Sequence, residues 1–227
     1  MFIGHYGVAF AVKARAPSLK LSVLFMAVQA LDLLFAAFLL LGAEHMRVVA
    51  RPVSAKLYDV FQLYDMHLSH SLVGALAWGL LATLVARLRL RWPAAAWLGV
   101  AVFSHFVLDI PMHPNDGLHP ADLHVAGAAS PGIGLGLWNH PALAVMSELG
   151  TFWVGLAIFA RWYWPFSRRL WAMVIFLSAM ATLPLFIPAG GTPKTFAVQI
   201  LVMTLALAGG AGWVERPLAG RAKVLSA

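Results

Sequence analysis

The sequence predicts an all-α, polytopic membrane protein: a bundle of six transmembrane helices with a short N-terminal half-helix and both termini in the cytoplasm. Hydrophobic residues make up 61% of the 227-residue chain and charged residues only 11%, against about 45–50% and about 25% in soluble domains. This composition excludes a soluble enzyme and a disordered chain. The chain has no cysteine, which excludes a disulfide scaffold, a thiolate nucleophile and Cys-bound zinc.

Six apolar stretches approach the roughly 20 residues that a membrane-spanning helix needs. We expect these spans at residues 21–42, 66–86, 92–110, 141–160, 170–187 and 196–214. A seventh apolar piece, 2–12, is about half as long, and it is either an interfacial helix or a half-helix between the full spans. The first cations, Lys13 and Arg15, follow this piece, so we expect no cleaved signal peptide. In the fifth span, Pro184 predicts a kink.

The basic residues predict the orientation of these spans. With six spans, twelve of the sixteen Lys and Arg residues lie on the side of the N-terminus and four lie on the other side. Cytoplasmic loops carry the excess of basic residues, so the N-terminal side is cytoplasmic. The net charge of +7 then reflects orientation rather than nucleic-acid binding. We expect one integral membrane domain, 1–227, with a long outer loop, 111–140, and a cytoplasmic tail, 215–227.

Ionisable side chains gather at one depth of the predicted bundle. A rise of about 1.5 Å per residue, counted from the nearest inner cation, places five of them about 18–27 Å up, in a layer roughly 10 Å thick. They are Asp32, His70, His105, Asp109 and Glu148. A half-helix over 2–12 would raise His5 towards the same layer. Because ionisable groups at such depth are costly and suggest function, we expect one polar pocket in the outer half of the bilayer.

His105 and Asp109 have the most informative spacing, because an offset of four residues places both on one helix face. There they can bind one metal, the acid can orient the imidazole, or the two can form a plain hydrogen-bonded pair. For Asp32 the alternative to a functional role is a helix-packing contact. Imidazoles and carboxylates without thiolates suit zinc or another divalent cation, and the set is large enough for two. We expect interfacial or solvated positions for His45, His67, His119 and His124.

Several motifs carry a resemblance to a known family. They are Met1-Phe-Ile-Gly-His-Tyr-Gly-Val-Ala-Phe, Gln29-Ala-Leu-Asp-Leu-Leu, Leu68-Ser-His-Ser-Leu-Val, Ser104-His-Phe-Val-Leu-Asp and Gly134-Leu-Gly-Leu-Trp-Asn. Over about residues 1–150 the chain resembles small bacterial inner-membrane proteins described as membrane-bound metal-dependent hydrolases. That family is distantly similar to the zinc-dependent phospholipases C. The resemblance implies a multi-pass protein of the bacterial inner membrane, with metal ligands at His5, Asp32, His70, His105, Asp109 and His113, and further site residues at His140 and Glu148.

Three functions remain open at this point. The first is a zinc-dependent hydrolase of a phosphoester or lipid headgroup, with Glu148 and His140 as catalytic residues. The second is a non-catalytic metal- or haem-binding subunit of a larger membrane complex, since the last two spans offer apolar surface to a membrane-protein partner. The third is a proton or ion pathway lined by Asp32, Asp109 and Glu148. In each case the lipid bilayer is a partner and nucleic acid is not.

Overall fold

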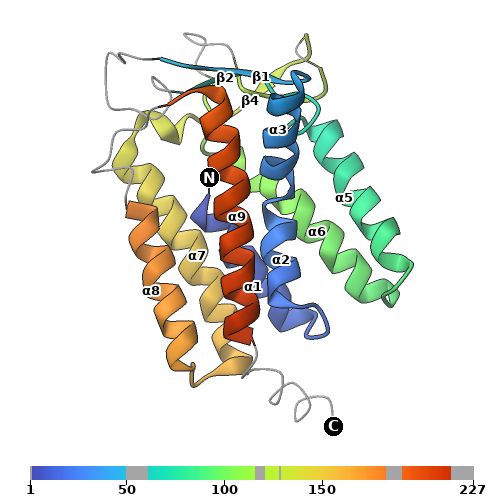
Figure 1. Ribbon diagram of the computed structural model, residues 1–227, viewed down its shortest axis with the longest axis vertical. Helices are drawn as coiled ribbons and strands as arrows, with labels where there is room; N and C mark the ends of the chain where they lie inside the picture. The colour runs from blue at the N-terminus through green and yellow to red at the C-terminus, as the bar shows by residue number, and fades with distance from the viewer. Residues whose placement is uncertain (1, 50–60, 116–120, 128, 183–190, 216–227) are drawn as a thin grey trace.

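The computed structural model describes residues 2–49, 61–115, 121–127, 129–182 and 191–215, and helices dominate them. Figure 1 shows the helices side by side as a bundle, with short strands gathered at one end. The helices are α1 (Ile3–Arg15), α2 (Leu21–Val28), α3 (Ala30–Leu41), α5 (Leu72–Arg87), α6 (Trp92–Asp109), α7 (Pro141–Tyr163), α8 (Arg168–Thr182) and α9 (Pro193–Glu215). The predicted helical class is therefore confirmed.

Three helices are long and apolar enough to cross a membrane, namely α6, α7 and α9. The pair α2 and α3 makes a fourth candidate if the two are counted as one bent span. The fifth apolar helix, α5, has only 16 residues. These helices support a membrane protein with three or four spans, while the count of six stays a prediction. The expected kink at Pro184 and the tail from residue 216 lie outside the described residues.

Two of the predicted spans differ from the observed helices. The stretch 21–42 is not one straight helix, because α2 and α3 meet at Gln29 with a bend of 56°. The Gln29 side chain donates a hydrogen bond to the carbonyl oxygen of Phe2, 3.1 Å away, and so ties the bend to the start of the chain. The stretch 66–86 becomes helical only at Leu72, because Ser71 caps the helix by accepting a hydrogen bond from the Gly74 amide.

The N-terminal helix α1 lies inside the bundle, where it packs on α7, α2 and α6. Ten of its 13 residues are buried, which fits a half-helix between longer helices and not an interfacial one. The Phe10 ring lies 5.2 Å from the ring of Phe159 and 5.6 Å from that of Phe25. Where α1 meets α7, Gly7 and Gly155 allow the two backbones to touch. This packing fixes the depth and rotation of α1.

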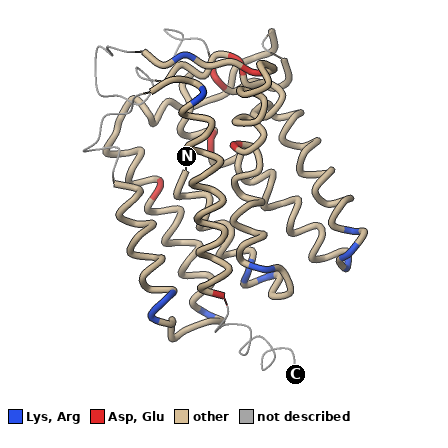
Figure 2. The backbone as a smooth tube through the Cα atoms, viewed as in Figure 1, with Lys and Arg blue, Asp and Glu red and all other residues tan. Residues whose placement is uncertain are grey.

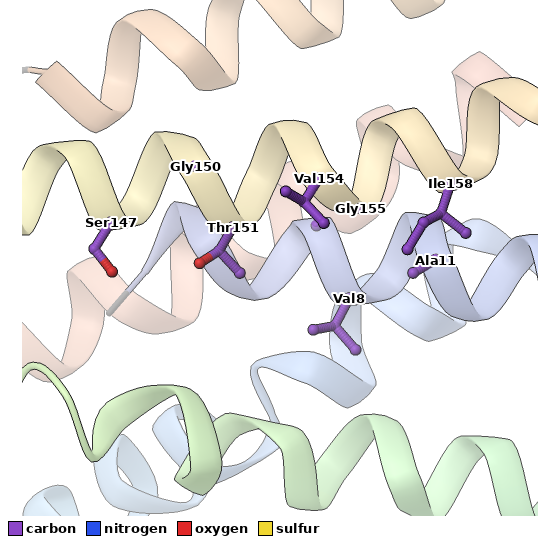
Figure 3. A pocket seen from close by; sticks show the side chains of 9 residues that line it. Val8, Ala11, Ser147, Gly150, Thr151, Val154, Gly155 and Ile158 are labelled. Atoms are coloured by element: carbon purple, nitrogen blue, oxygen red, sulfur yellow. The ribbon is translucent and has the colours of Figure 1, made fainter.

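A shallow groove of about 480 Å³ follows the outside of the α1–α7 contact. Figure 3 shows it lined from α7 by Ser147, Gly150 and Thr151 and from α1 by Val8 and Ala11. The side chains that line it are small or apolar. The groove is thus a consequence of the close helix contact, which leaves little side-chain bulk along the seam.

Short strands cover one end of the bundle. The strands β1 (His45–Val48) and β2 (Phe61–Asp65) pair antiparallel, as do β3 (Leu123–His124) and β4 (Gly132–Ile133). A 3₁₀ turn, η1 (Leu137–Asn139), precedes α7. The described parts of the predicted outer loop 111–140 contain no further helix long enough to span a membrane. They pack against the start of α5, where Val73 donates a backbone hydrogen bond to Val125.

Most basic residues lie at the opposite end of the bundle from the strands (Figure 2). Arg15 ends α1, Arg87 ends α5, and Arg161 lies in the last turn of α7. The strands and the described parts of the loop 111–140 therefore lie at the end of the bundle that has few basic residues.

Candidate metal centre

Five of the predicted site residues come together inside the bundle near its strand-covered end. His5 lies on α1, Asp32 on α3 and His70 in the turn before α5, while His105 and Asp109 lie on α6. Within the described residues, two groups have ligand atoms that all lie within 4.8 Å of one another. They are His5 with His105 and Asp109, and Asp32 with His70 and His105. We call these five residues the His/Asp cluster. The imidazoles and Asp109 are buried, and the Asp32 side chain is 17% exposed.

The group Asp32–His70–His105 is compact. The Nε2 atoms of His70 and His105 are 3.2 Å apart, and Asp32 Oδ1 lies 3.5 Å from the first and 3.6 Å from the second. Ligands bound tetrahedrally at about 2.0–2.1 Å from zinc are themselves roughly 3.3–3.4 Å apart. The three atoms therefore have the mutual spacing of ligands to one small divalent cation.

Asp109 connects this group to two further histidines. Its Oδ2 lies 3.2 Å from His105 Nε2, as the spacing of four residues predicts, and 3.8 Å from His113 Nε2. Its other oxygen, Oδ1, lies 3.5 Å from His5 Nε2. Asp109 Oδ2 also lies 3.8 Å from His70 Nε2, and Asp32 and Asp109 belong to different groups that share His105. Asp109 stands between the compact group and His5.

The outer nitrogen atoms of the histidines have partners that determine where the ring proton lies. His105 Nδ1 donates to the carbonyl oxygen of Val28, 2.7 Å away. The Ser69 hydroxyl donates to Glu44, 2.7 Å away, and therefore accepts a hydrogen bond from His70 Nδ1. With the proton on Nδ1, each Nε2 presents a lone pair to the interior of the cluster. Histidines that bind metals usually have such a second partner.

The break between α2 and α3 contributes directly to this arrangement. Val28 is the last residue of α2, and the last carbonyl groups of a helix lack partners within that helix. The Val28 carbonyl oxygen is therefore available to His105.

The surroundings of His113 lie on the far side of Asp109. His113 Nδ1 lies 3.1 Å from the buried carboxylate of Asp122, and the His113 ring lies 4.1 Å from the ring of Trp138.

These contacts test whether the residues fit a cation. Two lone pairs facing each other at 3.2 Å repel unless a cation or a proton lies between them, and two buried carboxylates add negative charge at low dielectric. Within the described residues, Nδ1 of buried His5 also lacks a hydrogen-bond partner, and its Nε2 has only the 3.5 Å contact with Asp109 Oδ1, which is costly in an apolar interior. A divalent cation would relieve the repulsion between the lone pairs, balance the charge of the two carboxylates and offer a partner to His5. The donor set of imidazole nitrogens and carboxylate oxygens suits zinc.

The two residues predicted to be catalytic lie outside the cluster. Glu148 on α7 accepts hydrogen bonds from the backbone amides of Phe2 at 2.7 Å and Gly4 at 2.6 Å. It thus satisfies amides at the start of α1 that have no partner within that helix. His140 is exposed at the start of α7. Neither residue belongs to the two groups of close ligand atoms in the described part of the chain.

Replacing Glu148 with Gln should therefore loosen α1. A neutral amide keeps the volume, but its NH₂ group faces a backbone donor, so at least one buried hydrogen bond is lost. We expect a stability loss of about 1–3 kcal/mol, measured by thermal unfolding in detergent, with metal retained at Asp32, His70 and His105. His140→Gln at the exposed position is the matched control and should leave unfolding unchanged. Equal unfolding temperatures for the two variants would contradict this role for Glu148.

The other histidines lie away from the cluster. Asp65 accepts hydrogen bonds from His45 at 2.7 Å and from His67 at 2.8 Å. Burial acts to raise the pKa of Asp65, but these two hydrogen bonds outweigh it and hold the pKa below its ordinary value. The His124 ring bonds to two backbone carbonyl oxygens within its own loop. The predicted position of His119 lies outside the described residues.

Sequence reasoning missed the residues that support the cluster. Glu44, Ser69 and Asp122 are buried. Ser69 contacts His70 and Glu44 contacts Ser69, whereas Asp122 contacts His113, which lies beside Asp109. Ser69 adjoins His70 in the chain, which is a local signal. Glu44 and Asp122 are brought to the cluster only by the turn and loop contacts of the fold, for which the sequence contains no spacing rule.

Comparisons of the chain with models of protein families, with curated proteins and with solved structures give no match. The fold and the cluster alone define the class: a helical protein with membrane-spanning candidates and buried His/Asp groups that could hold a metal ion.

Proposed function

We propose that this protein is a membrane-embedded hydrolase that depends on a divalent cation, zinc, and cleaves a phosphoester such as a lipid headgroup. The observation that carries the proposal is the compact group Asp32–His70–His105, whose ligand atoms lie 3.2–3.6 Å apart. The sequence motifs that resemble membrane-bound metal-dependent hydrolases of the bacterial inner membrane support the choice of reaction.

The residues of the cluster have distinct roles in this proposal. Asp32, His70 and His105 hold the cation, while His5 and Asp109 face it from the adjoining group. A bound divalent cation lowers the pKa of a water molecule and polarises a phosphoryl oxygen. His113, held by Asp122 and 3.8 Å from Asp109, is placed to accept a proton at Nε2. Glu148 positions α1 and His5 and does not act on the substrate.

The test combines metal analysis with an activity assay. Protein purified in detergent should contain a stoichiometric divalent metal and should hydrolyse bis(p-nitrophenyl) phosphate or vesicles of phosphatidylcholine. Chelation should abolish hydrolysis, and zinc should restore it. His70→Ala should remove both metal and activity, whereas His45→Ala, at an exposed position, should keep both. Bound metal without hydrolysis would instead favour the non-catalytic metal-binding subunit. Absence of metal would favour the proton or ion pathway.

The proposal includes six spans with the strand-covered end outside. Because the chain has no cysteine, single introduced cysteines can report sidedness. Tyr64 on β2 is 44% exposed, and Arg89 is exposed in the turn between α5 and α6. In intact cells, a membrane-impermeant maleimide should label Tyr64→Cys, and it should label Arg89→Cys only after permeabilisation. The reverse pattern would overturn the proposed orientation, and labelling of both in intact cells would exclude a spanning α5.

A further inference from the structure

Glu44 has a buried carboxylate that lies outside the His/Asp cluster but is linked to it by hydrogen bonds. Its Oε1 accepts hydrogen bonds from the backbone amides of Leu68 at 2.7 Å and Ser69 at 2.8 Å, and its Oε2 accepts one from the Ser69 hydroxyl at 2.7 Å. The same hydroxyl lies 2.8 Å from Nδ1 of His70, whose Nε2 faces the cluster. A continuous chain of hydrogen bonds thus runs from Glu44 through Ser69 to a candidate metal ligand.

The end of α3 determines where this carboxylate lies. Gly42 follows the helix with a φ of +72°, a left-handed conformation that favours glycine and ends the helix there. The amides of Ala43 and Glu44 then both donate to the carbonyl oxygen of Phe38, at 2.9 and 3.4 Å. Asp32 lies on the same helix. One segment of the chain therefore supplies a ligand of the proposed cation and holds a residue linked to another ligand.

The donors around Glu44 determine the direction of the hydrogen bonds along this chain. With three donors directed at it, the carboxylate acts only as an acceptor, so the Ser69 proton points to Oε2. The carbonyl oxygen of Met66, a second acceptor near the hydroxyl, is 3.5 Å away, longer than an ordinary hydrogen bond from a hydroxyl. The hydroxyl oxygen therefore accepts from Nδ1 of His70. A neutral imidazole with its proton on Nδ1 has a lone pair on Nε2.

We propose that Glu44 is a positioning residue, which acts through the Ser69 hydroxyl to keep the ring proton of His70 on Nδ1 and thereby leaves Nε2 free to bind the cation. The inference rests on the metal centre of the proposed function, but not on hydrolysis. Both backbone amides bond to Oε1, so stabilising the turn before α5 does not require Oε2. The bond between Oε2 and the hydroxyl is what distinguishes a positioning role from a purely structural one. Partners that orient a metal-binding histidine in this way also raise its basicity.

Glu44→Gln is the sharpest variant, because it keeps the volume of the side chain and changes one acceptor into a donor. The new amide oxygen can still accept from the two backbone amides, which places the NH₂ group against the Ser69 hydroxyl. The hydroxyl then accepts from NH₂ and donates to Nδ1 of His70, so the ring proton moves to Nε2 and blocks the lone pair that would bind metal. We expect the metal affinity to fall about 10–100-fold, measured on the full-length protein in detergent by competition between zinc and an indicator.

Glu148→Gln is the matched control, because the Glu148 carboxylate also accepts hydrogen bonds from two backbone amides and lies outside the two groups of close ligand atoms. It should keep the affinity of the wild type. Ser69→Ala should weaken binding, because Nδ1 of His70 loses its partner. Adding Glu44→Gln to Ser69→Ala should cost little further affinity, because the connecting hydroxyl is absent. Equal losses from Glu44→Gln with and without this hydroxyl would indicate a structural role and overturn the proposal. Wild-type affinity in Ser69→Ala would also overturn it, even if Glu44→Gln fails to fold.

The metal-free protein supplies a measurement that does not depend on the proposed function. Nitrogen NMR of histidine-labelled protein distinguishes protonated from unprotonated ring nitrogens, and the signals of His70 are those lost in His70→Ala. We expect the proton on Nδ1 in the wild type and on Nε2 in Glu44→Gln. A proton on the same nitrogen in both proteins would overturn the role of Glu44. Absence of metal from the wild type would instead contradict the proposed function, and the NMR result would still decide the role of Glu44.

Discussion

His105→Ala is expected to abolish metal binding, because His105 is the one residue shared by both groups of close ligand atoms. Its Nε2 lies 3.2 Å from both His70 Nε2 and Asp109 Oδ2 and 3.6 Å from Asp32 Oδ1. Loss of a residue that merely supports a metal ligand costs about 10–100-fold in affinity. Loss of the shared ligand should cost at least about 100-fold, measured by competition with a zinc indicator.

Asp109→Asn supplies a second, isosteric variant. It keeps the volume of the side chain but removes one of the two negative charges of the cluster, so it should weaken binding with little effect on folding. His45→Ala is the matched control, because His45 is exposed and bonds to Asp65 away from the cluster. Affinity that is equal in wild type, His105→Ala and Asp109→Asn would exclude a metal centre here.

Metal removal should also lower the stability of the protein, and the metal affinity itself should depend on pH. A ligand that binds only the folded state adds about 2.7 kcal/mol at one hundred times its Kd, so chelation should lower the unfolding temperature of the wild type but not that of His105→Ala. Histidine must be deprotonated to bind metal. Affinity should therefore fall as the pH is lowered, because protons then compete with the metal for the ring nitrogens.

The meeting of Asp32, His70 and His105 was predictable from the sequence because helical rise relates residue number to height along a bundle. Counting residues from the inner cations placed Asp32, His70 and His105 in one layer, and the structure brings them together. The offset of four residues likewise predicted the contact of Asp109 with His105. The second inference uses only the regular geometry of one helix. The first counted residues through the 56° bend between α2 and α3 and beyond the start of α5 at Leu72, so the depth itself stays a prediction.

Features that depend on distant contacts were not predictable in this way. The break at Gln29 accompanies its bond to Phe2, and the position of Glu44 depends on amides more than 20 residues away. Glu148 illustrates the limit of an argument from depth. Its predicted height is that of the cluster, but height contains no information about rotation, and its carboxylate bonds to the amides at the start of α1.

The contact between α1 and α7 supplies the second large effect. Gly155→Ala is expected to destabilise the protein strongly, because a Cβ at position 155 would overlap the backbone of Gly7. Backbone atoms in two packed helices cannot rotate away as a side chain can, so α1 and α7 must separate. Overpacking of this kind typically costs about 1–3 kcal/mol and occasionally more. Since α1 carries His5 and Tyr6, the displacement should also disturb the face of the cluster that His5 provides.

Gly150→Ala is the matched control for this prediction. Gly150 lies on the same helix, and a Cβ there would meet nothing within 4 Å. Alanine in a helix interior is more favourable than glycine by roughly 0.5–1 kcal/mol, so Gly150→Ala should leave the unfolding temperature unchanged or slightly raised, while Gly155→Ala lowers it. Thermal unfolding of the two purified variants in the same detergent makes the comparison. If Gly155→Ala unfolds at the temperature of Gly150→Ala, then α1 does not pack against α7 as closely as the structure describes, and the placement of His5 at the metal centre fails with it.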